Sequence, residues 1–330
     1  IYPVKQNNLK KIVVIGGGTG SFVLLSGLKE YPVELTAIVP VTDDGGSTGR
    51  LRDEFGFLPV GDMRQCLAAL AKENGLLRKL LLHRFAKGEG LEGHNVGNLI
   101  LTALEELTGG EPEAIAQAAK IFKLKGKVLP ISNQLVKLAA EYSDGETIIS
   151  EHKIEIHRLE KNEKIIKLYT IPQAKINPDA AQAIYAADLI IFAPGDLYNS
   201  IIADLVINGA KQAITRSPAK LLYIVNLMTL NSQTNYFSAA DHVRELEKYA
   251  GKTIDYILVN NQPIPKSIQQ AYQLEAEYPV IDDLAADPRV IRKPFLAGTL
   301  FQKPKSDQLK RSLLRHNPVK LAKTIISLIK

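Results

Sequence analysis

The sequence predicts an α/β fold, a Rossmann-like open and mostly parallel sheet with helices on both faces. First, a short β-branched run at 12–15 is followed by glycines, a segment with helical spacing at 21–30 and a second apolar run at 33–41. Second, these runs have few polar interruptions, as is typical of parallel strands covered on both faces. Third, the theme recurs, because further apolar runs followed by loops lie at 189–192, 220–225 and 255–259.

Helical patterns lie between or beside these runs, at 62–73, 97–107, 112–122, 179–187, 239–250 and 318–330. From about 125 to 171 the sequence alternates more strictly, as at 153–159. Such alternation is typical of half-exposed antiparallel strands, so we expect a small antiparallel β elaboration there. No Ser/Gly-rich linker separates this stretch from the rest, and we therefore predict a single nucleotide-binding α/β domain over 1–330.

Composition narrows the class of protein. With 330 residues, 45% of them hydrophobic, the chain can bury a large core and is neither collagen-like nor disordered. The single cysteine, Cys66, cannot form an internal disulfide and fits a reducing compartment. No apolar stretch is long enough to span a membrane, and the beginning of the sequence lacks the apolar core of a secretion signal. We expect a cytoplasmic protein.

The charge balance favours a small anionic partner over nucleic acid. Lys and Arg number 41 against 35 Asp and Glu, so the net charge is +6, and the basic residues are scattered. Trp is absent and aromatic residues make up 6% of the chain, so platforms for stacking single-stranded nucleic acid are scarce. We therefore expect no nucleic acid, and the polar loops described next make a nucleotide-linked small molecule the expected partner.

The first polar loop, Gly-Gly-Gly-Thr-Gly-Ser at 16–21, follows the first strand and opens a helix. Glycines let a phosphate approach the backbone closely, and a helix N-terminus offers N–H donors and partial positive charge. The loop matches G-x-G-x-x-G incompletely, and no Gly-Lys-Ser/Thr of a Walker A loop follows. A tight turn without a ligand is the alternative. The candidate phosphate-binding residues are Gly17, Gly18, Thr19, Gly20 and Ser21.

The second loop, at 41–50, follows the second strand and has two adjacent carboxylates, Asp43 and Asp44. An acidic residue at this point can bind ribose hydroxyls, whereas two carboxylates could instead hold Mg²⁺ beside a phosphate. Arg50 and Arg52 could neutralise phosphate charge. A solvated Asp-Gly turn is the alternative reading. Gly46 and Ser47 complete this candidate group.

Two further loops open helices. Asp62 is placed as a helix N-cap, and Arg64 opposes the helix dipole in the first turn, which indicates a nearby anion. His94, Asn95 and Asn98 could grip a base, a sugar or a phosphate, although a lone histidine is often structural. The remaining histidines considered show no metal-ligand spacing and are expected at the surface: His83, His152, His157 and His242.

The fifth loop, at 193–200, resembles the first in its logic, with glycine followed by polar side chains at a helix start. Asn226 follows the next strand, and Arg315 could add positive charge just before the last helix, whose expected N-cap is Asn317. Loops from several strand ends define the ligand crevice of such folds. The candidates from the fifth loop are Pro194, Gly195, Asp196 and Ser200.

Several of these motifs together resemble one known family. They are GGGTGSFVLLSGLK, VTDDGGSTGRLRDEFGFLPVGDMRQCLAAL, HNVGNLILTALEELTG, APGDLYNSII and NLMT followed by DHV. From about residue 11 to the carboxyl terminus the chain is similar to the YvcK-like gluconeogenesis factors of the CofD (2-phospho-L-lactate transferase) family. The resemblance implies a UDP-sugar ligand such as UDP-N-acetylglucosamine, and a role in gluconeogenic growth, cell shape and cell-wall synthesis. It also implies sugar-nucleotide contacts near Tyr272, with ordinary surface packing as the alternative there.

The transferase branch of the same family uses Mg²⁺ and a nucleoside-diphosphate-linked donor, and its carboxylates match Asp43 and Asp44. Departures from the YvcK-like pattern are local, at 231–235 and at Asp196, where a serine is common. A nucleotide-sugar-binding regulator is the leading hypothesis and a Mg²⁺-dependent transferase the alternative. An NAD(P) oxidoreductase is disfavoured, because the glycine fingerprint is incomplete. No catalytic residue is assigned, and a homo-oligomer or protein partners from cell-wall and carbon metabolism stay open.

Overall fold

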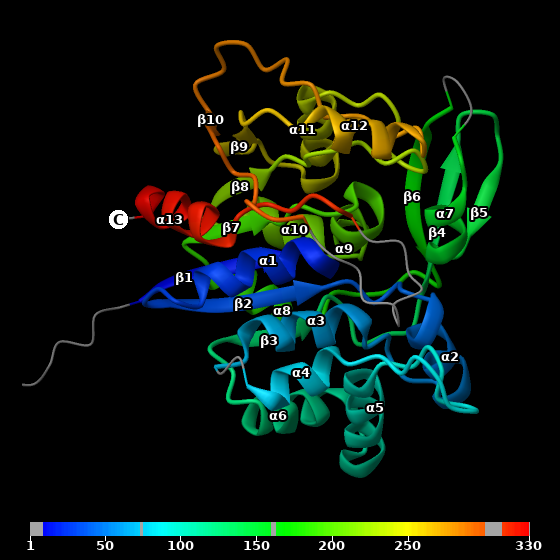
Figure 1. The fold of residues 1–330 in the computed structure, drawn as a ribbon. Helices are drawn as coiled ribbons and strands as arrows, with labels where there is room; N and C mark the ends of the chain where they lie inside the picture. The colour runs from blue at the N-terminus through cyan, green and yellow to red at the C-terminus, as the bar shows by residue number, and fades with distance from the viewer. Residues whose placement is uncertain (1–8, 73–74, 160–162, 301–311, 330) are drawn as a thin grey trace, which may run out of the picture.

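The computed structural model describes residues 9–72, 75–159, 163–300 and 312–329. Within them, seven parallel strands form one sheet in the order β10-β9-β8-β7-β1-β2-β3 (Figure 1), which confirms the predicted fold class. These strands are β1 (Lys10–Ile15), β2 (Val33–Val39), β3 (Lys127–Pro130), β7 (Leu189–Phe192), β8 (Lys220–Ile224), β9 (Tyr256–Asn260) and β10 (Val290–Lys293).

The strand order reverses at the carboxyl end of β1, and we call the region around this switch point the crevice. The chain builds the sheet outward from β1 through β2 to β3, and then returns to the other side of β1 with β7, where Ile15 pairs with Phe192. The loops after β1 and β7 therefore run in opposite directions from neighbouring strands. In open α/β sheets such a switch point is where ligands bind.

Two apolar cores cover the two faces of the sheet, because side chains alternate along each strand. Ile12 and Val14 of β1 lie in one core, and Val13 and Ile15 lie in the other. The helices are α1 (Gly18–Leu28), α2 (Gly46–Phe55), α3 (Gly61–Leu70), α4 (Leu76–Leu82), α5 (Val96–Thr108), α6 (Glu111–Ile121), α7 (Glu151–Ile156), α8 (Pro178–Ala186), the π-helix η1 (Leu197–Ile202), α9 (Ala203–Leu205), α10 (Ala210–Arg216), α11 (Ala239–Ala250), α12 (Lys266–Gln273) and α13 (Pro318–Leu328).

The first core packs α1, α3 and α13 against the sheet, and the second packs α8, α10 and α11 (Figure 1). Helices thus cover both faces, as predicted. None of the helices in the described ranges combines the length and apolarity needed to cross a membrane. Asn317 caps α13 as expected, since its side chain accepts hydrogen bonds from the N–H groups of Val319 and Lys320.

The antiparallel elaboration is present but smaller than predicted. Its strands are β4 (Lys137–Tyr142), β5 (Thr147–Ile149) and β6 (Ile165–Ile171), in the order β5-β4-β6. The stretch at 127–130 belongs instead to the parallel sheet, as β3.

The alternating residues at 153–159 were also wrongly assigned to a strand, because 151–156 forms the helix α7. Ser150 caps that helix by accepting a hydrogen bond from the N–H of Lys153, and only Ile154 of the helix is buried. A local cap therefore decides the conformation against the two-residue pattern. The helices α2, α4, α10 and α12 and the strand β10 were not predicted.

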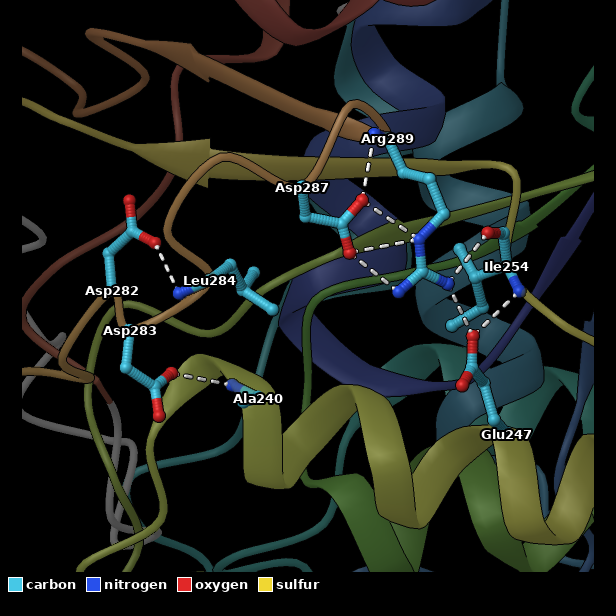
Figure 2. A network of polar contacts seen from close by, with 8 residues as sticks. All are labelled: Ala240, Glu247, Ile254, Asp282, Asp283, Leu284, Asp287 and Arg289. Carbon is cyan, nitrogen blue, oxygen red and sulfur yellow. Dashed lines mark hydrogen bonds and ion pairs between the residues drawn. The ribbon is translucent and has the colours of Figure 1, made fainter.

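A polar network ties the last strands to α11 (Figure 2). The guanidinium of Arg289 donates two hydrogen bonds of 3.0 Å and one of 2.7 Å to the carboxylate of Asp287, and another of 2.7 Å to Glu247 on α11. Glu247 in turn accepts from the N–H of Ile254, just before β9. The β9–β10 edge of the sheet is thereby fixed to α11.

The loops after β1 and β7 touch backbone to backbone. A Cβ added to Gly20 would lie 1.3 Å from the carbonyl oxygen of Pro194, so no side chain fits between them. Gly20 is a glycine because of this contact, which holds the start of α1 against the segment before η1.

We predict that Gly20→Ala destabilises the protein by about 3 kcal/mol or more, because the methyl group must displace backbone on both sides. Gly75→Ala is the control, since a Cβ there meets no atom within 4 Å. Chemical denaturation of both variants measures the effect. Equal stabilities for the two would contradict the packing described.

Candidate functional site

Three strand ends are joined by hydrogen bonds around the crevice. The N–H of Gly195, after β7, donates to Oδ1 of Asn226 at 3.3 Å, and Nδ2 of Asn226, after β8, donates to the Gly195 carbonyl at 2.7 Å. Gly20 packs on Pro194 from the β1 side. The predicted loops at 16–21 and 193–200 and Asn226 therefore lie together, and Ser200 also contributes backbone close to Gly16.

Asp62 caps a helix, but not the one predicted. The helix α3 begins at Gly61 without a side-chain cap. The carboxylate of Asp62 instead accepts a hydrogen bond of 2.8 Å from the N–H of Gly18, at the start of α1. It also packs closely on Gly17, where an added Cβ would lie 1.8 Å from Oδ2. An anionic side chain of the protein thus sits at the helix N-terminus that the sequence suggested for a phosphate.

Four carboxylates from four loops act on one another at the crevice, and we call them the acidic cluster: Asp43, Asp62, Glu151 and Asp196. Burial and, to a smaller extent, the charges of Asp43 and Asp196 raise the pKa of Asp62 to about 7, against the opposing effects of the Gly18 N–H and of Arg64. Burial raises the pKa of Glu151 well above its usual range, as do the other three carboxylates. Burial is also the main reason that the pKa of Asp43 is raised.

Glu151 was missed by the sequence reasoning, because 151–156 was expected to be a strand rather than a helix start. It comes to the cluster because Asp44 holds α7 in place. Oδ1 of Asp44 accepts hydrogen bonds from the Ser150 hydroxyl at 3.0 Å and from the N–H of His152 at 2.8 Å. Of the two adjacent aspartates, Asp43 thus belongs to the cluster while Asp44 positions its neighbour.

The cluster is not a preformed metal centre. Among the described ranges, no three His, Cys, Asp or Glu side chains are placed to ligate one metal ion together. Asp43 is held by the N–H of Gly45 at 3.0 Å and by the hydroxyl of Thr48. Gly61 permits this position, since a Cβ there would lie 2.7 Å from Oδ2 of Asp43.

A second group of predicted residues is buried and holds helices together. The Ser47 hydroxyl lies 3.1 Å from Nδ1 of His94 and accepts a hydrogen bond of 3.3 Å from Nδ2 of Asn98. Nε of Arg64 donates to Oδ1 of Asn98 at 2.8 Å, and Asn95 caps α5. These contacts join α2, α3 and α5. The sequence indicated an anion near Arg64, and in the structure the amide oxygen of Asn98 accepts a hydrogen bond from its guanidinium.

His94 and the arginines of the second loop have local roles as well. Burial lowers the pKa of His94, and the positive charge of Arg50 lowers it further, so the ring is neutral at pH 7. Arg50 is exposed and donates to the carbonyl of Glu92, beside the exposed Gly46 end of α2. Arg52 is buried and donates to the carbonyls of Thr42, Asp43 and Val136, which fixes the loop after β2.

Three other predicted residues are Ser21 and Thr19, at the start of α1, and Tyr272, on α12. The hydroxyl of Ser21 donates to the Gly16 carbonyl at 2.8 Å and is buried, whereas Thr19 is half-buried at the start of α1. The hydroxyl of Tyr272 lies 2.8 Å from that of Ser312 and accepts from the N–H groups of Leu313 and Leu314. Tyr272 therefore anchors the segment that leads to α13.

The same segment brings Arg315 to the crevice side of the sheet. The neighbouring His316 hydrogen-bonds to the backbone of Val225, directly before Asn226 at the end of β8. Arg315 is half-buried there. His242, expected at the surface, is fully buried, because it lies on the inner face of α11 with Nδ1 2.8 Å from the Ser238 carbonyl.

Outside the acidic cluster, several buried polar atoms of the described residues have no hydrogen-bond partner. In the described part of the chain, Oδ1 of Asn199, both carboxylate oxygens of Asp204 and Nε2 of Gln233 have no hydrogen-bond partner. Asn199 lies on the π-helix η1, and Oε1 of Gln233 accepts from the N–H of Tyr198 on that helix. π-Helices are frequent at functional sites, and no local sequence pattern marks these residues.

The raised pKa of Asp62 has a consequence for stability. Its pKa is higher in the folded chain than the ordinary 3.8, so the folded state holds the proton more tightly, and stability is lost as the pH rises from 4 through about 7. We predict that the unfolding free energy of Asp62→Asn, relative to that of the wild type, increases by about 2 kcal/mol as the pH rises from 5 to 8.

Chemical denaturation across that pH range measures this difference. Asp53→Asn, on the exposed side of α2, is the matched control and should follow the wild type. If Asp62→Asn keeps the pH dependence of the wild type, Asp62 does not bear the burial and repulsion described.

Comparison with known proteins agrees with the architecture. The sequence pattern of the 2-phospho-L-lactate transferase CofD family matches residues 12–296. A protein named gluconeogenesis factor from Bacillus subtilis is 40% identical over 326 residues, covering 97% of this chain and 98% of its own. The gluconeogenesis factor of Halalkalibacterium halodurans is 39% identical over 319 residues, 96% of each chain.

A crystal structure of a UPF0052 family member from Bacillus halodurans superposes with a TM-score of 0.86 at 38% identity. It covers 97% of this chain and 99% of that one. The fold, the position of the glycine loops and these full-length relationships lead to one assignment. The chain belongs to the CofD family, in which its relatives of about 40% identity are named gluconeogenesis factors.

Proposed function

We propose that the chain binds a UDP-sugar, such as UDP-N-acetylglucosamine, in the crevice, and acts as a regulatory protein. The observation that carries the proposal is the backbone contact of two glycine loops at the switch point between β1 and β7. Such close loops leave backbone N–H groups and little side-chain bulk, which suits a diphosphate. The first-turn N–H groups of Thr19 and Gly20 have no partner within α1 and are the donors we assign to it.

The acidic cluster requires a positive charge before a diphosphate can bind beside it. Mg²⁺ prefers oxygen ligands and is commonly held by one or two carboxylates together with substrate phosphates. Asp43 and Asp196 fit that role, with Asp62 adjoining them, whereas Asp44 is engaged by Ser150 and His152. When bound, Mg²⁺ would supply charge neutralisation, and Arg315 would add a second positive group at the β8 end.

The partnerless polar atoms suit the uncharged parts of the ligand. Oδ1 of Asn199 and Nε2 of Gln233 are buried beside η1, where an acceptor and a donor can recognise a sugar acetamido group or a base edge. Gln233 falls within 231–235, the stretch that departs from the YvcK-like pattern. We assign the choice of sugar or base to this side of the crevice.

One observation favours the alternative, a Mg²⁺-dependent transferase using a nucleoside-diphosphate-linked donor. Asp62 has a pKa of about 7, which suits a general base at neutral pH. The family is named for a transferase. The two functions differ in whether the bound donor is cleaved.

Calorimetry with UDP-N-acetylglucosamine and Mg²⁺ tests the binding proposal, and ³¹P NMR of the same mixture shows whether the diphosphate survives. We predict micromolar binding that weakens at least tenfold on removal of Mg²⁺ or in Asp43→Asn, with Asp53→Asn unchanged. An intact diphosphate supports the regulator, and cleavage supports the transferase. No binding at millimolar ligand contradicts both for this nucleotide sugar.

The physiological part of the proposal is a role in gluconeogenic growth, cell shape and wall synthesis. The names of the full-length relatives support the gluconeogenic part of this role. The chain should restore growth on a gluconeogenic carbon source to a Bacillus subtilis strain lacking its own gluconeogenesis factor. Asp43→Asn should fail to do so at equal protein level, and rescue by that variant would separate growth from ligand binding.

A further inference from the structure

Two glutamates meet at an open cavity of about 320 Å³ that is separate from the crevice. Glu105 comes from the last turns of α5, and Glu111 begins α6. The turn after α2 contributes Gly56 and Leu58, and the loop after β3 contributes Asn133. None of the predicted site residues lines this cavity.

The two carboxylates are buried to a degree that demands a partner. Glu105 is 8% exposed and Glu111 is 6% exposed, and both carboxylate oxygens of Glu111 lack a hydrogen-bond partner among the described atoms. Burial raises the pKa of each to about 7, and the charge of Glu105 adds to the effect on Glu111. An unpaired buried carboxylate is costly, so each must hold a proton or face a cation.

The lining favours a metal ion over an organic ligand. Beside the apolar Leu58, Pro112 and Leu135 it contains two glutamates, Asn133 and no basic side chain, so the charged ligand atoms on offer are hard oxygens. One divalent cation neutralises both glutamates at once. At roughly 30 Å³ for each water, the cavity has room for the water molecules that Mg²⁺ retains.

We propose that Glu105 and Glu111, with Asn133, bind a hydrated divalent cation of the Mg²⁺ and Mn²⁺ class at this cavity. The site joins the end of α5, the start of α6 and the loop after β3, and the cation would lock these elements together. The proposal does not depend on the nucleotide ligand, because none of these residues belongs to the acidic cluster.

Equilibrium binding of Mn²⁺, measured by the EPR signal of the free ion, tests the proposal in the full chain. The Asp43→Asn background weakens the crevice contribution. In that background, Glu111→Gln should weaken Mn²⁺ binding at least tenfold, and Glu105→Gln should do the same. Glu113→Gln is the control, because Glu113 is exposed on the same helical turn and pairs with Gln117.

Protons compete with the cation, so Mn²⁺ affinity in the Asp43→Asn background should rise roughly tenfold or more from pH 6 to pH 8. This measurement needs no change at the cavity and applies even if the glutamine variants fold poorly. Unchanged Mn²⁺ binding in Glu111→Gln, or affinity independent of pH, overturns the proposal and leaves a protonated glutamate pair. Stabilisation by methylammonium but not by Mn²⁺ would also overturn it.

Discussion

The contact between Gly20 and the Pro194 carbonyl is the constraint on which the crevice depends. It brings two loops, 174 positions apart in the chain, into backbone contact at the point where the strand order of the sheet reverses. The reciprocal hydrogen bonds between Gly195 and Asn226 extend the junction to β8. The ends of β1, β7 and β8 are therefore linked into one edge. The contact with the loop after β7, rather than a cap from its own N-cap residue, positions the start of α1.

Electrostatics decides what this edge can bind. Asp62 occupies the N-terminus of α1, with Asp43, Glu151 and Asp196 nearby. Burial, together with the neighbouring carboxylates, raises the pKa values of Asp62 and Glu151, and the edge resists a bare anion. A nucleotide diphosphate becomes a suitable ligand only with a cation between it and the cluster. In the proposed binding mode the glycine loops would supply close approach, and the carboxylates would couple that approach to metal and protons. This coupling is a physical route by which one site could sense its ligand.

The sequence was informative where structure is local or repetitive. Apolar runs followed by glycine predicted the parallel sheet and the convergence of the loops after β1 and β7. The sequence was uninformative where hydrogen-bond partners are far apart in the chain. Asp62 was expected to cap its own helix, because nothing local shows that its hydrogen-bond donor is Gly18. Glu151 was missed because the Ser150 cap overrides an alternating pattern, and the sequence did not show that Asn98 hydrogen-bonds to both Ser47 and Arg64.

Hydrogen exchange followed by mass spectrometry tests most directly the claim that the crevice is the ligand site. With UDP-N-acetylglucosamine and Mg²⁺ at saturation, peptides covering 16–28, 43–50, 193–203 and 226–235 should gain protection together. Peptides from α6 should exchange as they do with Mg²⁺ alone. Protection confined to other segments, or absent from 16–28 while the ligand is bound, would contradict the account.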